Sequence, residues 1–77
     1  MNREFSDKLL HLRAKKRPWR SVYKTAELMG LSCSALRRYE LGLAVPTVES
    51  LALIADYYHV SMDFLWGRCD DENFSSR

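Results

Sequence analysis

Residues 21–40, SVYKTAELMGLSCSALRRYE, decide the fold of this 77-residue chain. They contain two short segments in which apolar residues have helical spacing, joined by the tetrapeptide MGLS at positions 29–32. Gly30 can adopt the positive φ that ends a helix within one residue. Ser32 can cap the following helix by accepting a hydrogen bond from a backbone N–H. The turn therefore predicts a helix over residues 33–41 directly after another helix.

The first of these helices is predicted from a cap at Ser21 to about Met29, and both helices are apolar on one side. The other side of the second helix carries small, polar and basic residues. These are Cys33, Ser34, Arg37 and Arg38. An apolar back, a polar and basic front and a tight glycine turn predict a helix-turn-helix.

Length and composition restrict the function classes. With 47% hydrophobic residues, 77 residues can form one small domain, and not two. The two cysteines, Cys33 and Cys69, match no zinc-site spacing, and the lack of a signal peptide suggests a reducing compartment. No apolar run approaches the roughly 18 residues of a membrane span. We therefore expect a cytoplasmic protein that binds no membrane, metal or other cofactor.

Charge is unevenly distributed, although the net charge is only +2. Residues 1–24 carry a net charge of +6, residues 25–50 carry −1 and residues 51–77 carry −3. This asymmetry suggests that one side of the molecule faces a polyanion. We find neither a glycine-rich phosphate loop nor a Ser/His/Asp or Cys/His set at plausible separation, so we do not expect an enzyme.

An ordered set of residues between positions 5 and 67 resembles the helix-turn-helix family of phage Cro proteins and repressors. The set is Met29-Gly30-Leu31-Ser32, Leu36, Arg38-Tyr39-Glu40, Gly42, Pro46 and Ser61-x-Asp63-x-Leu65-x-Gly67. No single member is specific, but the ordered set is. The resemblance implies an all-α fold, a compact five-helix lambda-repressor-like DNA-binding domain over residues 1–67. Residues 68–77 are expected to form a short polar tail that frays.

The resemblance also implies a partner, double-stranded DNA, with the helix over residues 33–41 in the major groove. By position in the motif, the residues that contact bases are Cys33, Ser34, Arg37 and Arg38. The residues expected to contact phosphates are Arg20, Ser21, Tyr23, Lys24 and Ser32. Arginine can make two parallel hydrogen bonds to guanine. A redox role for Cys33 at a helix N-terminus is conceivable, but a plain small side chain is the simpler interpretation.

The first helix is predicted to begin at a cap at Asn2 and to end in the basic run 15–20, which is either a solvated surface or a phosphate contact. Trp19 in this run is expected to cover the gap between the first two helices, since an indole is large and mostly apolar. In the family, an arginine at the place of Arg13 pairs with the glutamate at the place of Glu40. The alternative is that both side chains are solvated.

The chain departs from the family pattern at two places. Val22 replaces a glutamine that often contacts the DNA backbone, and residues 41–46 contain no Lys or Arg where related proteins often bind phosphates. Some of the side chains of Leu41, Leu43 and Val45 are expected to pack inward, and otherwise they would form an exposed apolar patch.

Thr47 is predicted to cap a fourth helix, and Ser61 a short fifth helix that Gly67 ends. Aromatic residues near the end of the chain exceed what a small core needs. We expect them to form the interface of a homodimer on a palindromic operator, with Tyr58, Phe64 and Trp66 as candidates. Leu43 and Val45 of the preceding loop are expected to contribute to the same interface. The alternative is that they only cover the core of the monomer.

These observations favour a sequence-specific, repressor-like transcriptional regulator from a bacterium, phage or mobile element, without a small-molecule ligand domain. A second hypothesis is a protein-interaction module that keeps the helix-turn-helix fold and binds DNA weakly or not at all. Val22, the loop 41–46 and the acidic tail favour this alternative. The DNA hypothesis predicts one face that gathers four basic side chains, those of Arg20, Lys24, Arg37 and Arg38.

Overall fold

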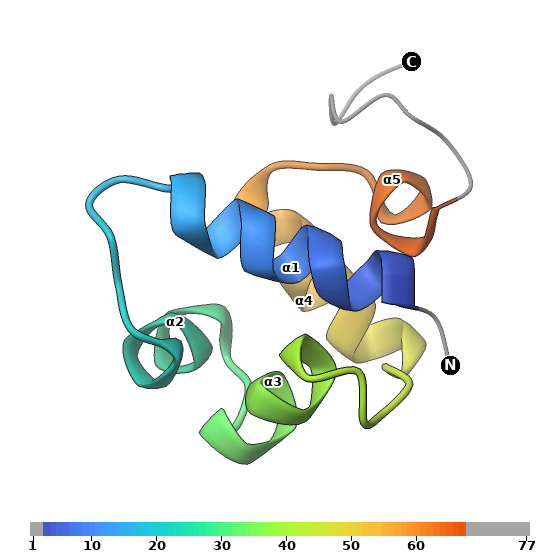
Figure 1. Ribbon diagram of the computed structural model, residues 1–77, viewed down its shortest axis with the longest axis horizontal. Helices are drawn as coiled ribbons and strands as arrows, with labels where there is room; N and C mark the ends of the chain where they lie inside the picture. The colour runs from blue at the N-terminus through green and yellow to red at the C-terminus, as the bar shows by residue number, and fades with distance from the viewer. Residues whose placement is uncertain (1–2, 68–77) are drawn as a thin grey trace.

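The computed structural model describes residues 3–67, which form five helices joined by short connections (Figure 1). The helices are α1 (Arg3–Lys15), α2 (Val22–Met29), α3 (Cys33–Glu40), α4 (Val48–Tyr58) and α5 (Met62–Trp66). This part of the chain contains no strand, so the predicted all-α class is confirmed. The predictions for Asn2, Cys69 and the tail 68–77 lie outside the described residues.

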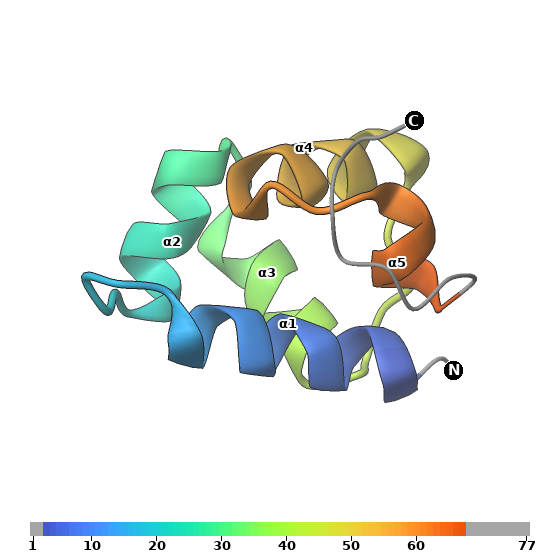
Figure 2. The same ribbon diagram turned by 90° about the horizontal axis from the view of Figure 1, so that it is seen from above.

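The helices surround a single core. α1 and α4 lie on opposite sides of the molecule, with α2 at one end and α5 at the other (Figure 2). α3 packs against α1 and α2, and α5 packs against α1 and α4. Between residues 3 and 67, no helix is both long and apolar enough to pass through a membrane.

Local capping residues set the helix boundaries. Four hydroxyl side chains each accept a hydrogen bond from the backbone N–H three residues further on, at 3.0–3.3 Å: Ser21, Ser32, Thr47 and Ser61. Gly30 ends α2 and Gly67 ends α5 in the left-handed conformation, with φ of 88° and 87°. His59 ends α4 in the same way, with φ of 58°. The predicted caps of α2 to α5 are therefore confirmed.

The core takes side chains from every helix. Its buried apolar residues are Phe5, Leu9, Leu12, Ala26, Met29, Leu36, Tyr39, Ile54, Ala55, Val60 and Leu65. The ring of Phe5 is buried, and its centroid lies 6.1 Å from that of Tyr39 and 5.7 Å from that of Trp66. Val60, in the connection before α5, and the polar Thr25 are buried although the sequence pattern did not predict this.

The predicted end of α3 was wrong by one residue. The helix ends at Glu40, and Leu41 is its C-cap. Gly42 then adopts a left-handed conformation with φ of 76°, and the N–H of Leu43 donates to the carbonyl of Arg38 at 2.8 Å. This hydrogen bond satisfies one of the last carbonyls of the helix.

Two predictions about connections were also wrong. Trp19 does not cover the gap between α1 and α2, because it is 58% exposed and its ring centroid lies 5.8 Å from the Arg13 guanidinium carbon. None of Leu41, Leu43 and Val45 packs inward, since each is at least 60% exposed. The short connection leaves these side chains on the surface while α4 completes the core with Ile54 and Ala55.

Candidate nucleic-acid interface

The helix-turn-helix segment provides two capped N-termini, those of α2 and α3. Ser21 Oγ accepts from the N–H of Lys24 at 3.3 Å, and Ser32 Oγ accepts from the N–H of Ala35 at 3.1 Å. Each hydroxyl accepts here, so its own proton can still be donated to a phosphate oxygen. Free N–H groups and the helix dipole also favour an anion at a helix N-terminus. Both ends can therefore contact phosphates.

The outer side of α3 presents three of the four residues predicted to contact bases. Ser34, Arg37 and Arg38 are exposed, whereas Cys33 is half-buried and packs against the core. The three exposed residues lie three and four positions apart, so they share one helix face. Neither guanidinium has an ion-pair partner within residues 3–67. This face therefore carries donors that are free to bind.

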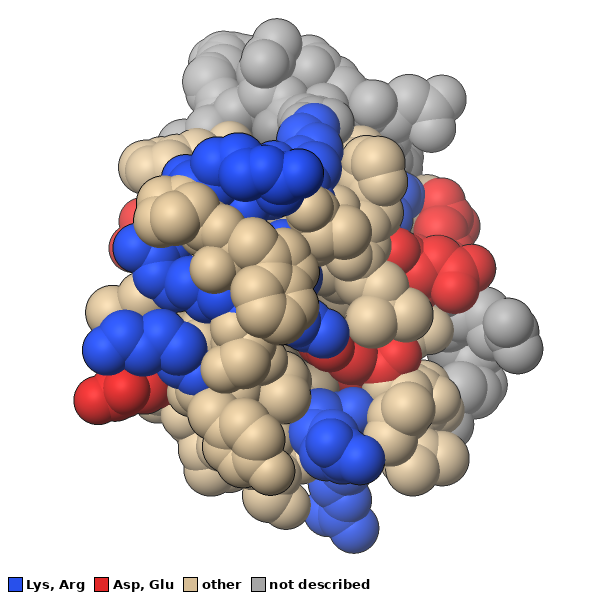
Figure 3. Space-filling model, turned by 60° about the vertical axis from the view of Figure 1, so that its left-hand side comes forward, with Lys and Arg blue, Asp and Glu red and all other residues tan. Residues whose placement is uncertain are grey.

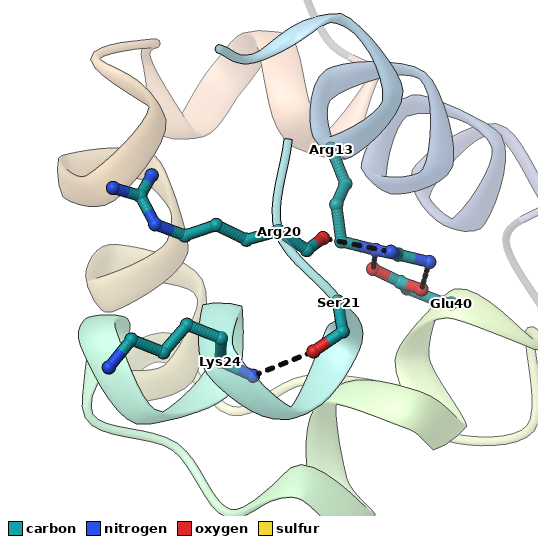
Figure 4. A network of polar contacts seen from close by, with 5 residues as sticks. All are labelled: Arg13, Arg20, Ser21, Lys24 and Glu40. Atoms are coloured by element: carbon teal, nitrogen blue, oxygen red, sulfur yellow. Dashed lines mark hydrogen bonds and ion pairs between the residues drawn. The ribbon is translucent and has the colours of Figure 1, made fainter. Parts of the chain in front are cut away.

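The predicted pair of Arg13 and Glu40 is present (Figure 4). Arg13 Nε and Nη2 donate to the two carboxylate oxygens of Glu40 at 2.9 and 3.0 Å, and Nη1 donates to the carbonyl of Arg20 at 3.3 Å. Hydrogen bonding to Glu40 raises the pKa of Arg13, against the opposing effect of desolvation. The side chain of Glu40 is only 6% exposed. The pair thus holds the end of α3 against α1 and against the chain entering α2.

Arg20 and Lys24 extend to the same side of the molecule, away from Glu40 (Figure 4). Arg20 Nη1 donates to the hydroxyl of Tyr57 at 3.4 Å, so its guanidinium is held near the end of α4. The ammonium of Lys24 lies 3.5 Å from a carboxylate oxygen of Glu27. Both of these side chains are more than half exposed, so the ion pair is weak and does not prevent Lys24 from binding a phosphate.

Tyr57 was not predicted as part of the site, and Lys16 was considered only as a member of the basic run that either is solvated or contacts phosphate. The ammonium of Lys16 lies 5.0 Å from the centroid of the Tyr57 ring, and the hydroxyl of the same tyrosine accepts from Arg20. Two cations are therefore held against one tyrosine. The basic run 15–17 was a signal for Lys16, but nothing in the sequence indicates Tyr57, because its contact with Arg20 joins positions 37 residues apart.

Positive charge gathers on the face that carries the α1–α2 connection, α2 and α3 (Figure 3). Residues 39–67 contain no Lys or Arg, so all the basic side chains of the described part come from the elements before the end of α3. No group of His, Cys, Asp or Glu within residues 3–67 could hold a metal ion. The chemistry of this face suits a phosphate backbone with base edges beside it.

Residues 20–65, which make up more than half of the chain, match the family model described as helix-turn-helix. The chain belongs to the helix-turn-helix family. Its relation to the Cro and phage-repressor type is confirmed, and the matched range contains the whole of α2, α3 and α4.

Two curated proteins are similar to this helix-turn-helix chain. It is 42% identical over 62 residues to the HTH-type transcriptional regulator AnsR of Bacillus subtilis (strain 168), an overlap covering 80% of this chain and 52% of AnsR. It is 43% identical over 49 residues to the cryptic phage CTXphi transcriptional repressor RstR of Vibrio cholerae serotype O1, covering 62% of this chain and 44% of RstR. The chain spans about half the length of these relatives. No solved structure matches it significantly.

The three aromatic residues predicted to form a dimer interface are all half-buried in the helix-turn-helix domain. Trp66 packs against Phe5 in the core, and the ammonium of Lys8 lies 4.5 Å from the centroid of the Phe64 ring. The hydroxyl of Tyr58 is buried and has no hydrogen-bond partner in the described part of the chain. All three side chains pack against the core of this one domain, whatever they contribute to a dimer.

Tyr58→Phe is expected to leave the domain at least as stable at pH 7, because the lost hydroxyl makes no hydrogen bond within residues 3–67. Burial, reinforced by the charge of Glu40, raises the pKa of Tyr58 well above its ordinary value. Unfolding lowers this pKa to about 10, so the free energy of unfolding of the parent should fall as the pH rises above about 10, while the variant lacks this loss. Urea unfolding at pH 7 and pH 11 measures both effects. If the free energies of unfolding of the parent and of Tyr58→Phe changed equally between pH 7 and pH 11, the raised pKa would not belong to Tyr58.

Proposed function

We propose that this helix-turn-helix domain binds a specific sequence of double-stranded DNA by inserting α3 into the major groove. The observation that carries the proposal is the exposed set of Ser34, Arg37 and Arg38 on a helix whose inner side is buried, with neither arginine ion-paired within residues 3–67. The major groove admits one helix, and residues near its N-terminus reach the base edges. Cys33 completes the proposed groove-facing set, with only part of its side chain accessible. Within this set we assign base discrimination to Arg38 and a position at the groove edge to Arg37.

Phosphate contacts are proposed around the N-termini of α2 and α3. The hydroxyls of Ser21 and Ser32 can each donate to a phosphate oxygen while they cap their helices. Tyr23 and Lys24 are exposed in the first turn of α2, and Arg20 directly precedes its cap. These positions would fix the orientation of α3 on the duplex without reading the base sequence.

We further propose that the domain acts as a transcriptional repressor in the cytoplasm, as a homodimer on a palindromic operator. RstR is named as a repressor and AnsR as a transcriptional regulator, and both are more than 40% identical to this chain over the aligned residues. One eight-residue helix covers only a few base pairs. A two-fold pair would place two such helices about one DNA turn, roughly 34 Å, apart. The proposal requires no cofactor and no catalysis.

Selection of bound sequences from a random duplex pool tests this function. The expected result is enrichment of one short motif, present as two inverted copies, and loss of the enrichment when Arg37 and Arg38 are both replaced by alanine. No enrichment even at low salt would contradict sequence-specific DNA binding and would favour the protein-interaction alternative.

The affinity for the selected duplex is expected to fall moderately with salt. Arg20, Lys24, Arg37, Arg38 and one lysine of the run 15–17 allow at most about five phosphate contacts per subunit. A plot of log affinity against log salt should therefore have a slope no steeper than about −4.5 per subunit. Fluorescence anisotropy at several salt concentrations measures the slope. Lys24→Ala should make it shallower by about one. A slope near zero would contradict binding through the DNA backbone.

A further inference from the structure

Two cations and a tyrosine join the α1–α2 connection to the C-terminal end of α4. The ammonium of Lys16 lies 5.0 Å from the centroid of the Tyr57 ring. Arg20 Nη1 donates to the hydroxyl of the same tyrosine at 3.4 Å. All three side chains are half-buried, so packing against the domain restricts their positions. We call Lys16, Arg20 and Tyr57 the Tyr57 cluster.

The positive charge of the Tyr57 cluster is not neutralised by a carboxylate. Neither Lys16 nor Arg20 has an ion-pair partner within residues 3–67. Residues 13–25 contain no Asp or Glu. On α4, Asp56 directly precedes Tyr57, but it lines a different groove. Two cations held against one ring repel each other, so this arrangement favours the binding of an anion.

The space behind the Tyr57 cluster is closed to a small ligand. The cluster borders a hollow that Pro18 and Thr25 also line, and this hollow is too narrow to admit a water molecule. An anion can therefore reach the two cations only from the outer surface. A site that is cationic outside and filled inside suits one phosphate of an extended polyanion better than an enclosed small molecule.

We propose that the Tyr57 cluster binds a DNA phosphate outside the base pairs that α3 contacts. Arg20 extends to the same side of the molecule as Lys24 and away from Glu40, the last residue of α3 (Figure 4). Its guanidinium is held at the end of α4, an element that has no part in the contacts proposed above. The inference rests on the proposed DNA binding and adds to it a contact with the flanking duplex.

Tyr57 acts in this site mainly as a positioning residue. Its ring supports the ammonium of Lys16, and its hydroxyl accepts from Arg20. Long basic side chains lose conformational freedom when they bind, and side chains that are already held in place lose less. Because the hydroxyl accepts here, its own proton can be donated to the same phosphate. Two of the five phosphate contacts counted above would then belong to the flanking duplex.

Two duplexes of different length test the site. Both contain the selected sequence, one with about two and the other with about eight flanking base pairs at each end, so that the longer flank extends roughly 27 Å. The parent should bind the long duplex about tenfold more tightly than the short one. Its slope of log affinity against log salt should be steeper by about two on the long duplex, because two further phosphates release their counterions.

Variants of the cluster should lose this gain. Lys16→Gln should reduce it to at most about threefold and the difference in slope to about one. Tyr57→Phe keeps the ring beside Lys16 and removes only the hydroxyl that holds Arg20, so it should lose part of the gain. Both variants should bind the short duplex like the parent. Lys8→Gln is the matched control, because it removes a lysine of α1 whose ammonium also lies near an aromatic ring, 4.5 Å from the Phe64 centroid, and it should keep the full gain.

Several results would overturn the proposed site. They are no gain from the longer flank in the parent, an equal gain in the parent and both cluster variants, an equal loss on both duplexes, and the same loss in Lys8→Gln. Circular dichroism checks that each variant is folded, and Tyr57→Phe carries the test if Lys16→Gln is not.

Duplexes of random sequence separate this inference from the function on which it rests. If the parent does not prefer the selected sequence but gains affinity with duplex length through Lys16 and Tyr57, the proposed function fails and the site stands. If the parent prefers the selected sequence and shows no gain with length, the site fails and the function stands. If the parent binds no duplex, both fail.

Discussion

Arg13→Ala is expected to lower the free energy of unfolding by about 3 kcal/mol, because it leaves the carboxylate of Glu40 without its ion-pair partner in a shielded position. The Glu40 side chain is 6% exposed, so water cannot readily replace the two lost hydrogen bonds. A domain of this size has a total stability of roughly 4–12 kcal/mol, so the loss would be a large part of it. Urea unfolding followed by circular dichroism measures the change.

Two further variants identify the cause of that loss. Lys24→Ala removes an exposed ion pair with Glu27 and should change the free energy of unfolding by less than about 0.5 kcal/mol. Replacing Arg13 by methionine and Glu40 by leucine together should restore most of the stability lost in Arg13→Ala, since no unpaired charge then remains buried. If Arg13→Ala lowered the free energy of unfolding by less than about 1 kcal/mol, the pair of Arg13 and Glu40 would stabilise the domain no more than a solvent-exposed ion pair does.

The fold could be predicted to a large extent because its boundaries depend on local chemistry. Ser32 caps α3 and Gly30 ends α2 wherever the rest of the chain lies, since both effects act within four residues along the chain. The spacing of Phe5, Leu9 and Leu12 likewise reveals the buried side of α1 without knowledge of its partners. The pair of Arg13 and Glu40 was predicted only through the family resemblance, because the two positions are 27 residues apart.

The contacts that the sequence did not reveal depend on the tertiary arrangement. Arg20 contacts Tyr57 only because α4 ends beside the α1–α2 connection. An arginine and a tyrosine have many possible partners, so the sequence does not indicate that these two side chains meet. Trp19 is apolar and was expected to be covered, yet it lies against the Arg13 guanidinium and remains mostly exposed. Hydrophobic character alone also suggested that some of Leu41, Leu43 and Val45 pack inward, although the core is already completed by other side chains. Which apolar residues stay outside is decided by the space that the packed helices leave.

The second large effect is expected at Arg38. Arg38→Ala should weaken binding to the selected duplex by about 1–3 kcal/mol, roughly 5- to 150-fold, and weaken binding to random DNA much less, because one guanidinium that makes two hydrogen bonds to a guanine provides discrimination of this size. The guanidinium is exposed on α3 and has no ion-pair partner among residues 3–67, so it can form such a pair without breaking a contact. Anisotropy titrations with both duplexes at one salt concentration measure the difference.

Arg37 and a conservative change at Arg38 complete the test. Arg37→Ala should weaken binding to selected and random duplexes by similar factors, as expected for a residue at the groove edge that contacts phosphate. Arg38→Lys keeps the charge but loses the planar fork, so it should retain affinity for random DNA and still lose preference for the selected sequence. If both alanine variants lose equally on both duplexes, neither arginine reads a base and the assignment of Arg38 is wrong. If Arg37→Ala alone loses the preference, the two roles are exchanged.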